Sequence, residues 1–403
     1  MSFLLSVAEA FARVLATIRP LPAETVPLAQ AAGRILAENL HADRDFPPFD
    51  RVAMDGLALR HAAWAAGQTE FVLEGTQYAG APAVPLRQPQ AAIEVMTGAV
   101  LPPGTDVVVR YEDLEISNGR ARIQIAPLAP GTNIHPRAAD RRQGDLLLPA
   151  GTRLGPAEVA VAATVGAAQV LVQRRPRVAL ISTGDELVPV EATPLPHQIR
   201  RSNTSALAAL FALDGTDCEQ FYFPDDLASL RLGLPALLGS PYDAVVFSGA
   251  VSQGKADFLP GVLHELGVRE IFHGVAQRPG KPLWFGEVAG GPVVFGLPGN
   301  PVSTLLTAVR YVRPWLHGCQ QPARPPLLPV AALAAAVQFR PALTHFLLVR
   351  LRPDAQARLR AEPLPSGGSG DLAGLLDADG FVELPADTMD FSEGSYWPYW
   401  LLK

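Results

Sequence analysis

The stretch Val178-Ala-Leu-Ile-Ser-Thr-Gly-Asp-Glu186 decides the fold, because an apolar strand-like run ends in a glycine turn with two carboxylates. Two more apolar runs end similarly, at Ser248-Gly-Ala-Val-Ser252 and Gly296-Leu-Pro-Gly-Asn-Pro301. Strand-like and helical stretches alternate here, which is typical of βαβ units in a mostly parallel sheet. The expected strands are 178–182, 219–223, 243–247 and 293–295, and the expected helices are 203–213, 226–238 and one beginning near Pro301. Ligands bind beyond the carboxyl ends of such strands, so the loops predict a site at one sheet edge.

The chain of 403 residues is too long for one ordinary core and predicts several domains. Pro-rich stretches near residues 174 and 325 bracket the central domain. The expected domains are a discontinuous N-terminal domain of 1–45 and 141–175, a small β-rich domain of 46–140, the α/β domain of 176–322 and a C-terminal β-barrel-like domain of 323–403. The fold class is therefore α/β multidomain, with a three-layer central domain. The flanking pieces 1–45 and 141–175 look helical or irregular.

Two helices are predicted outside the central domain. Ser6-Val-Ala-Glu9 is a capping-box pattern that starts an amphipathic helix ending near Ile18. The apolar stretch Val159–Val172 predicts a buried helix, since a membrane span needs about 20 mostly apolar residues. No signal peptide is apparent at the amino terminus, which lacks a basic region.

Composition excludes several classes of function. A net charge of −6 gives no overall field that favours polyanions, so we expect no nucleic-acid partner and no membrane. Cys218 and Cys319 are isolated, without the spacing of a zinc site or a disulfide framework. A reducing compartment, the cytoplasm, fits this cysteine usage best.

The three loops carry groups suited to a metal ion and phosphate. Thr183, Gly184 and Glu186 form a carboxylate-bearing turn that could hold Mg²⁺, which prefers one or two carboxylates with water and substrate phosphate. The second loop could bind an anion through successive backbone N–H groups, and Asp257 follows it. The residues proposed there are Ser248, Gly249, Ser252 and Gly254. A solvated turn or a helix cap explains each of these groups equally well when it is taken alone.

Two further loops suggest oxyanion binding. Arg278-Pro-Gly-Lys281 places two cations around a rigid turn, whereas its alternative is an exposed β-turn. In Pro298-Gly-Asn-Pro301, Asn300 could cap the following helix with Pro301 at its first position, and Gly299 lies between them. In the β-rich domain, Asp55 and Thr97 lie on glycine-containing turns that are individually unremarkable.

Several common catalytic patterns are absent from the sequence. There is no GxxxxGK[ST] phosphate loop, and the Gly-rich residues 367–370 are too weak a match to a dinucleotide-binding fingerprint. No HExxH or close histidine pair is present, and no Gly-x-Ser-x-Gly elbow. Ordinary nucleotide hydrolysis and serine hydrolysis are therefore not supported.

Taken together and in order, the motifs resemble those of the molybdopterin molybdenumtransferases, a family of molybdenum insertases that includes the E domain of gephyrin. The resemblance covers nearly the whole chain. The matching segments are Ser6–Arg19, Pro47–Gly56, Met96–Gly98, Asn133–Asp140, Leu148–Thr152, Ser182–Leu187, Ser248–Asp257, Arg278–Pro282 and Gly296–Ser303.

The resemblance implies a transferase that performs the last step of molybdenum cofactor synthesis. Adenylated molybdopterin and molybdate would give molybdenum cofactor, AMP and water, with Mg²⁺ bound by Glu186 and Asp257. Arg278 and Lys281 would hold the phosphates or molybdate. The family's functional polar positions correspond to Asp55, Thr97, Asp140, Glu186 and Asp257, and Ser369 would contact molybdate. The family also implies a homodimer whose cleft joins the central domain of one subunit to the β domain of the other, and transient contact with other molybdenum cofactor enzymes.

The sequence departs from the family pattern at several positions. Ala250 replaces a glycine, Gly274 stands where a basic residue is common, and Leu348 replaces an arginine of the last domain. Arg350 could restore that charge only with a register shift of two residues, about 7 Å. Two alternatives remain open. One is a molybdopterin adenylyltransferase, which uses a domain similar to residues 177–320, and the other is a non-catalytic molybdopterin-binding scaffold.

Overall fold

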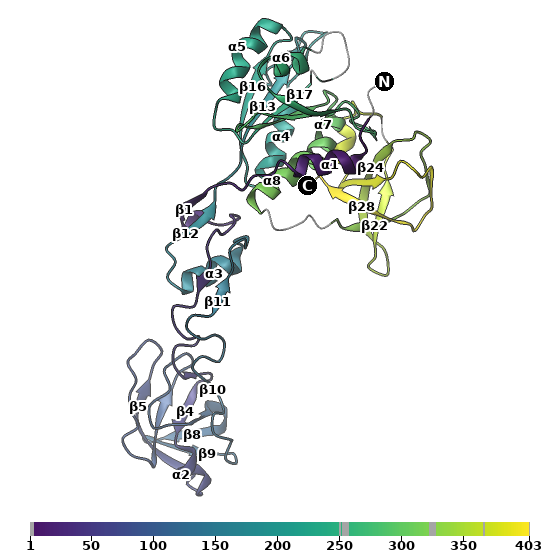
Figure 1. Cartoon of the computed structure of the whole chain (residues 1–403). Coiled ribbons are helices and arrows are strands. Elements are labelled where there is room, and N and C mark those ends of the chain that lie inside the picture. Colours follow the sequence, from purple (N-terminus) through teal and green to yellow (C-terminus); the bar gives the residue numbers. More distant parts are fainter. Residues whose placement is uncertain (1–3, 250, 252–257, 322–327, 366, 403) are drawn as a thin grey trace. The chain divides into compact units, whose positions relative to one another are not determined.

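The computed structural model describes residues 4–249, 251, 258–321, 328–365 and 367–402 (Figure 1). Its contacts divide the chain into two compact units. The first comprises Met1–Glu24 and Gln173–Lys403, and the second comprises Thr25–Val172. The architecture confirms the predicted α/β multidomain class. Across the described ranges, no helix combines the length and apolar character that a membrane span requires.

A six-stranded, mostly parallel sheet forms the centre of the first unit. Its order is β16-β13-β17-β21-β20-β18, and only the last two strands run antiparallel to their neighbours. The strands are β13 Arg177–Thr183, β16 Asp217–Phe223, β17 Ala244–Ser248, β18 Arg269–His273, β20 Trp284–Glu287 and β21 Val293–Leu297. The predicted strands and their parallel pairing are therefore confirmed.

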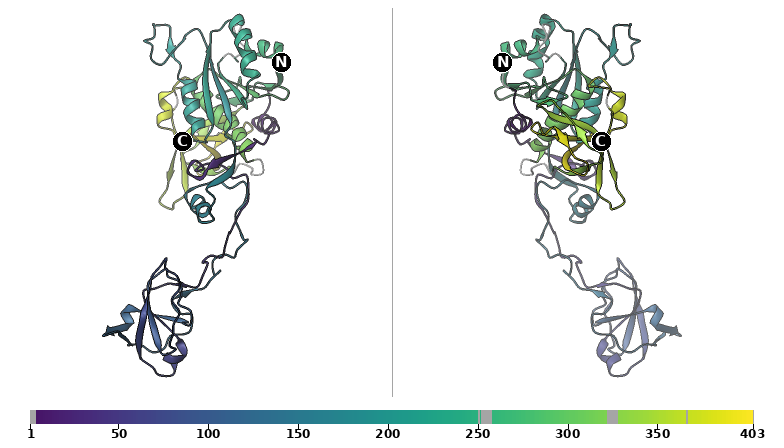
Figure 2. Two further views of the ribbon diagram at one scale, coloured as in Figure 1. Left: turned by 90° about the vertical axis from the view of Figure 1, so that its left-hand side faces the viewer. Right: turned by 90° about the vertical axis from the view of Figure 1, so that its right-hand side faces the viewer.

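Helices cover both faces of this sheet, so the unit contains a three-layer arrangement (Figures 1 and 2). Alternate residues of one strand enter different cores, as β13 shows: Val178 and Leu180 pack on one face, and Ala179 and Ile181 on the other. Helices α5 and α6 pack on the second face, and α4, α7 and α8 on the first. Their bounds are α4 Asn203–Ala212, α5 Leu227–Leu238, α6 Leu259–Glu265, α7 Pro301–Thr307 and α8 Arg313–Gln320, with a π-helical segment, Ala308–Val312, between the last two.

A closed barrel of five strands follows in the carboxyl-terminal part of this unit, as predicted. The ring runs β24-β25-β22-β28-β26 and closes through the pairing of β26 with β24. Its strands are β22 Val330–Leu333, β24 Thr344–Pro353, β25 Leu359–Pro363, β26 Gly380–Leu384 and β28 Tyr396–Leu401. A short strand of the central region, β19 Gln277–Arg278, pairs in parallel with β24. This pairing fixes the Arg278 loop against the barrel.

The amino-terminal helix α1, Val7–Leu15, belongs to the first unit. Its predicted capping box is confirmed: the Ser6 hydroxyl accepts from the Glu9 backbone N–H at 3.2 Å, and the Glu9 carboxylate accepts from the Ser6 backbone N–H at 2.9 Å. Helix α1 contacts α8, and Trp315 Nε1 donates to Thr17 Oγ1 at 3.0 Å. The predicted discontinuous domain included residues 1–45, whereas residues 1–24 group with 173–403 because of these contacts.

The second unit contains a six-stranded sheet of order β7-β4-β6-β5-β9-β8. Its elements are β4 Gly56–Leu59, β5 Glu70–Gln77, β6 Ala91–Val95, β7 Val107–Arg110, β8 Leu114–Ser117 and β9 Arg120–Ile123, with helix α2 His61–Ala65. The pair β3 Arg51–Val52 and β10 Ile134–His135 extends from it. Residues 46–140 are therefore β-rich, as the spacing of Pro and Gly predicts.

The pieces that flank this sheet are paired strands rather than purely helical or irregular chain. Strand β1 Ala23–Pro27 pairs with β12 Gln169–Gln173, and β2 Leu40–His41 pairs with β11 Leu146–Leu148. The prediction of one buried helix over 159–172 is wrong. Helix α3, Pro156–Thr164, buries only Ala162 and ends before a turn at Gly166, after which β12 begins. Val170 and Val172 alternate toward a shared core, which favours a strand.

Candidate functional site

A cavity of about 1050 Å³ lies at the carboxyl ends of β13, β17 and β21 in the first unit. Strand β13 has β16 on one side and β17 on the other, so the strand order reverses there. Such switch points are where open α/β sheets bind ligands. Barrel residues complete the wall, including Phe339, His345 and Leu348.

The cavity gathers most of the predicted residues of the first unit. They are Thr183, Glu186, Ser248, Gly249, Arg278, Lys281, Pro298, Gly299, Asn300, Pro301 and Ser369. Gly184 is not in the wall, but its φ of +143° disfavours any residue with a side chain, and an ideal Cβ there would lie 2.6 Å from Glu186 Oε2, so the carboxylate would have to move. The predicted Ser252, Gly254 and Asp257 lie outside the described residues.

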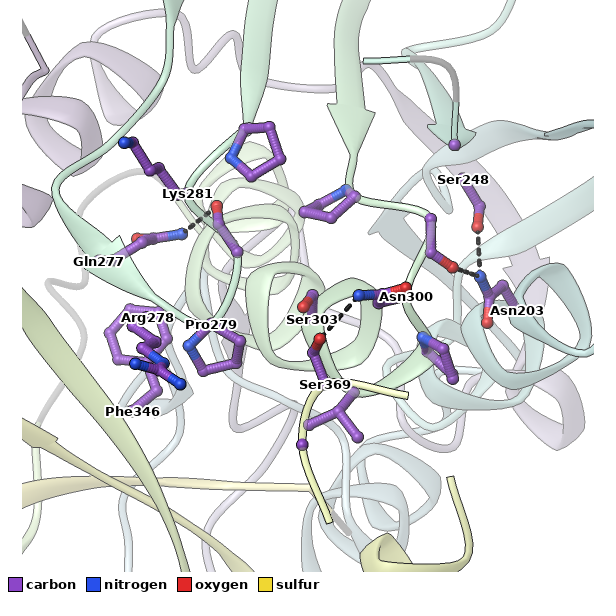
Figure 3. Close-up of a pocket in the computed structure, with 18 of the residues that line it drawn as sticks. Asn203, Ser248, Gln277, Arg278, Pro279, Lys281, Asn300, Ser303, Phe346 and Ser369 are labelled. Carbon is purple, nitrogen blue, oxygen red and sulfur yellow. Dashed lines mark hydrogen bonds between the residues drawn. The ribbon is translucent and has the colours of Figure 1, made fainter. Parts of the chain in front are cut away.

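Asn300 does not cap helix α7 with its side chain, although Pro301 occupies the first helical position as predicted. Its Nδ2 instead donates to Ser369 Oγ at 2.7 Å (Figure 3). The backbone N–H of Val302 donates to the Ser369 carbonyl at 3.1 Å, so a loop from the barrel region satisfies the helix end. Asn300 is therefore the N-cap residue by position, as predicted, but its side chain binds a partner that is distant in sequence instead of capping the helix.

At Gly249, the second loop does not offer its backbone N–H to an anion. The Gly249 N–H donates to the Leu297 carbonyl at 3.1 Å and is therefore already used. Thr183 Oγ1, by contrast, is buried and lacks a hydrogen-bond partner within the described ranges. A buried polar atom of this kind favours a ligand contact, because leaving it unpaired costs roughly 1–3 kcal/mol.

Asn203 is a site residue that the sequence did not identify. Its Nδ2 donates to Ser248 Oγ and to the Gly299 carbonyl, both at 2.8 Å, and lies 3.3 Å from Thr304 Oγ1 (Figure 3). One amide therefore ties the ends of β17 and the loop after β21 together. An asparagine at the start of a helix is more typical of a cap, so the sequence carried no signal for this role.

The described wall is rich in positive charge. Its cationic residues are Arg200, Arg201, Arg278, Lys281 and Arg340, and its carboxylates are Glu186 and Asp225. Arg201 stacks over the Tyr222 ring at 5.0 Å, and Arg340 contacts Asp390 at 3.3 Å. Within the described ranges, Arg278 and Lys281 line the cavity and form no side-chain hydrogen bond or ion pair (Figure 3). The excess of cations suits a bound polyanion.

His345 is a second site residue that the sequence did not reveal. It lies opposite Arg278 in the β19–β24 pairing, and its ring stacks on Phe339 with centroids 4.1 Å apart. Its Nδ1 is buried and has no partner among the described residues. Burial, and then the Arg278 charge, lower the pKa of His345 to about 4, so the ring is neutral near pH 7.

Two departures from the family pattern have a structural account. Leu348 lines the cavity, whereas Arg350 points elsewhere and donates from Nη2 to Asp377 Oδ1 at 2.7 Å. The register shift that would bring Arg350 into the wall is therefore absent. Gly274 packs so closely that an ideal Cβ would lie 2.8 Å from Leu4 Cδ2, which excludes a basic side chain without rearrangement.

The second unit holds the remaining predicted residues. Thr97 N–H donates to Asp55 Oδ1 at 2.6 Å, so these two predicted residues lie together. This backbone bond, with one from the Thr97 side chain, holds the pKa of Asp55 below its usual value. Asp140, the third predicted residue of this unit, contacts a different partner: its Oδ1 lies 3.0 Å from His135 Nε2. Among the described residues, no group of three or more His, Cys, Asp or Glu side chains is arranged for a metal ion.

Comparisons with known proteins agree with this architecture. Residues 5–166 match the model of the MoeA N-terminal region (domain I and II), residues 179–318 match a probable molybdopterin binding domain, and residues 330–402 match the MoeA C-terminal region (domain IV). The chain is 39% identical over 381 residues to a molybdopterin molybdenumtransferase of Synechocystis, covering 93% of this chain and 94% of that one. It is 31% identical to one of Bacillus subtilis, covering 92% and 88%.

Solved structures of MoeA proteins are also similar to this chain. A crystal structure of a molybdopterin biosynthesis MoeA protein from a Pyrococcus species is 33% identical, with a TM-score of 0.84 and full coverage of both chains. A second MoeA structure, from Pyrococcus horikoshii, is 26% identical with a TM-score of 0.74, covering 99% of this chain and 100% of that one. Similarity in sequence, domain order and fold thus extends along the whole chain. The chain belongs to the molybdopterin molybdenumtransferase family.

Proposed function

We propose that this chain transfers molybdenum from molybdate to adenylated molybdopterin and releases AMP, the last step of molybdenum cofactor biosynthesis. The observation that carries the proposal is the cationic cavity at the sheet edge, whose wall includes Arg278 and Lys281. Both substrates are anions, and cleavage of a pyrophosphate bond increases negative charge on the leaving AMP. Fixed cations stabilise such charge in a partly enclosed site.

The carboxylates of the described wall suit Mg²⁺, which binds proteins through one or two carboxylates together with water and phosphate oxygens. Glu186 lines the cavity beside the tight turn at Gly184, and Asp225 also lies in the wall. We propose that Glu186 binds the ion with Asp257, a residue outside the described ranges. Bound there, Mg²⁺ would offset charge on the phosphates.

Residues of the wall have separate proposed tasks. Arg278 and Lys281 bind molybdate or the phosphates, with Ser369 held beside them by Asn300. The orphaned Thr183 hydroxyl donates to the substrate. Leu348 leaves the barrel side of the cavity uncharged, which supports a molybdate affinity lower than that of relatives with an arginine there.

The proposal includes a homodimer in the cytoplasm. Asp55, Thr97 and Asp140 belong to the second unit, and their part in catalysis would follow if one subunit supplied them to the cavity of the other. Within the described ranges both cysteines are free thiols, which is consistent with a reducing compartment. We also retain 46–140, 176–322 and 323–403 as proposed domain limits.

The test of the activity uses the purified full chain with adenylated molybdopterin, molybdate and Mg²⁺. We expect AMP release that requires both molybdate and Mg²⁺. Consumption of ATP with free molybdopterin would identify an adenylyltransferase instead, and tight binding without turnover would identify a scaffold.

Asp257→Asn is expected to fold normally and release AMP at least tenfold more slowly, since an amide is a poorer Mg²⁺ ligand. An unchanged rate would refute the metal assignment.

Complementation between variants tests the dimer. Asp55→Asn and Glu186→Gln should each be inactive alone, but co-expressed subunits should recover part of the activity. A mixed dimer with shared sites contains one cavity that has both wild-type carboxylates. No recovery from a mixed dimer isolated by two affinity tags would refute a site shared across subunits.

A further inference from the structure

The π-helical segment Ala308–Val312 places two buried side chains that the proposed mechanism does not use. Insertions of this kind occur frequently at functional sites, because they redirect side chains at a cost in helix regularity. Arg310 turns toward the barrel, where it pairs with Glu383 at 2.7 Å and stacks on Trp400 at 4.6 Å. Tyr311, the next residue, reaches the loop that carries the cavity cations.

Two consecutive hydrogen bonds connect Tyr311 to that loop. The Tyr311 hydroxyl donates to Gln277 Oε1 at 2.6 Å. Gln277 Nε2 in turn donates to the Gly280 carbonyl at 2.9 Å (Figure 3). Tyr311 and Gln277 have no exposed surface. Gln277 also borders the cavity. Because both side chains are buried, losing one partner would leave the other unpaired.

The direction of this relay is fixed by chemistry. The Gly280 carbonyl can only accept, so the Gln277 amide must present its nitrogen to it and its oxygen to Tyr311. Tyr311 must then donate. Burial raises the pKa of the Tyr311 phenol above its ordinary value, so the hydroxyl keeps its proton across the physiological range.

The same loop is held tightly on its other sides. Gly280 lies so close to the helix that an ideal Cβ would be 2.5 Å from Thr307 Cγ2. The Val275 N–H donates to the Lys281 carbonyl at 2.9 Å, and Arg278 is paired with the barrel through β19 and β24. Between these contacts, the buried Gln277 amide bonds to the Gly280 carbonyl and so holds the turn closed.

We propose that Tyr311 and Gln277 are positioning residues that hold Arg278 and Lys281 in the geometry that binds an oxyanion. The inference rests on the proposed function, which assigns those two cations to molybdate or phosphate. Without the relay, the turn would sample other conformations, and substrate binding would have to order it. Pre-organisation of this kind removes an entropic cost from binding.

The experiment compares Tyr311→Phe, Gln277→Met and the double variant, all as the full chain. Tyr311→Phe removes one hydroxyl, and Gln277→Met removes both hydrogen bonds at similar volume. The matched control is Tyr242→Phe, which deletes a tyrosine hydroxyl that donates to Glu219, neither residue being in the cavity wall. Measurements are the Kd of molybdate by calorimetry, the KM for molybdate and kcat of AMP release, and thermal unfolding.

We expect Tyr311→Phe to weaken molybdate binding about tenfold, the effect of one lost buried hydrogen bond. KM should rise by a similar factor, with kcat changed less than twofold. The Tyr311→Phe effect should disappear in the Gln277→Met background, since the residues act in series. The Tyr242→Phe control should bind molybdate as the wild type does.

Three results would overturn the inference. Tyr311→Phe with wild-type Kd and KM for molybdate would show that the relay is only structural, while the proposed function stands. Additive losses in the double variant would show that Tyr311 does not act through Gln277. If the wild-type protein itself neither binds molybdate nor releases AMP, the proposed function fails, and the inference fails with it.

Discussion

Replacing His345 with phenylalanine should remove a specific pH dependence of stability. In the folded protein, burial and the neighbouring Arg278 lower the pKa of His345 from 6.5 to about 4. The unfolded chain binds a proton at this residue below pH 6.5, whereas the folded chain does so only near pH 4. Between these values the unfolded state binds more protons, so the free energy of unfolding falls as the pH is lowered.

The magnitude follows from that difference in pKa. Each pKa unit corresponds to about 1.4 kcal/mol, so His345 alone should remove about 3 kcal/mol of stability between pH 6.5 and pH 4. Phenylalanine keeps a planar ring to stack on Phe339 and does not titrate. The difference in stability between variant and wild type should therefore shift in favour of the variant by about 3 kcal/mol over this range.

Urea unfolding of both proteins at pH 7.5, 6.5, 5.5 and 4.5, followed by tryptophan fluorescence, measures this difference. At pH 7.5 both side chains are neutral, so the comparison there reports packing alone. A difference that stays constant across the series would refute the reasoning. Histidine NMR provides a direct check, because the resonance missing from the His345→Phe spectrum should titrate near pH 4.

Two further substitutions test the anchors of the first unit. Asp214→Asn should lower the free energy of unfolding by about 3–5 kcal/mol, because Arg313 would be left without its counter-charge. In the folded protein Arg313 donates to this buried carboxylate at 2.7 and 2.9 Å. A loss below about 1 kcal/mol in urea titrations would contradict this account. Gly280→Ala should destabilise by roughly 1–2 kcal/mol through its φ of +91°, with an added clash against Thr307. It should also raise the KM for molybdate, and wild-type kinetics would show that the tight packing of this turn is irrelevant to the site.

Local patterns in the sequence predicted much of the site because they reflect local physics. Short continuous apolar runs predicted β13, β17 and β21, and parallel pairing brings the loops after them to one edge. The Arg278-Pro-Gly-Lys281 turn was recognisable by its cations and its rigid residues. Contacts between distant segments were not predictable in this way, as the Asn203–Ser248 hydrogen bond and the pairing of His345 with Arg278 show.

The departures from the predictions have the same origin. Residues 169–173 are apolar enough for a helix, and pairing with residues 23–27 makes them a strand. Asn300 has the sequence context of a helix cap, yet it donates to Ser369, 69 positions away. The conformational preference of a short segment is weak, so tertiary contacts with distant segments can override it.

The sequence by itself determined the α/β class, the capped amino-terminal helix and the glycine-rich loops at the strand ends. These depend on residue periodicity and on backbone preferences that act over a few positions. Only the tertiary structure decided that Leu348 rather than Arg350 faces the cavity, and that Tyr311 reaches Gln277 from a π-helical segment. Strand register and side-chain direction arise from packing between segments far apart in the chain, and no local pattern records them.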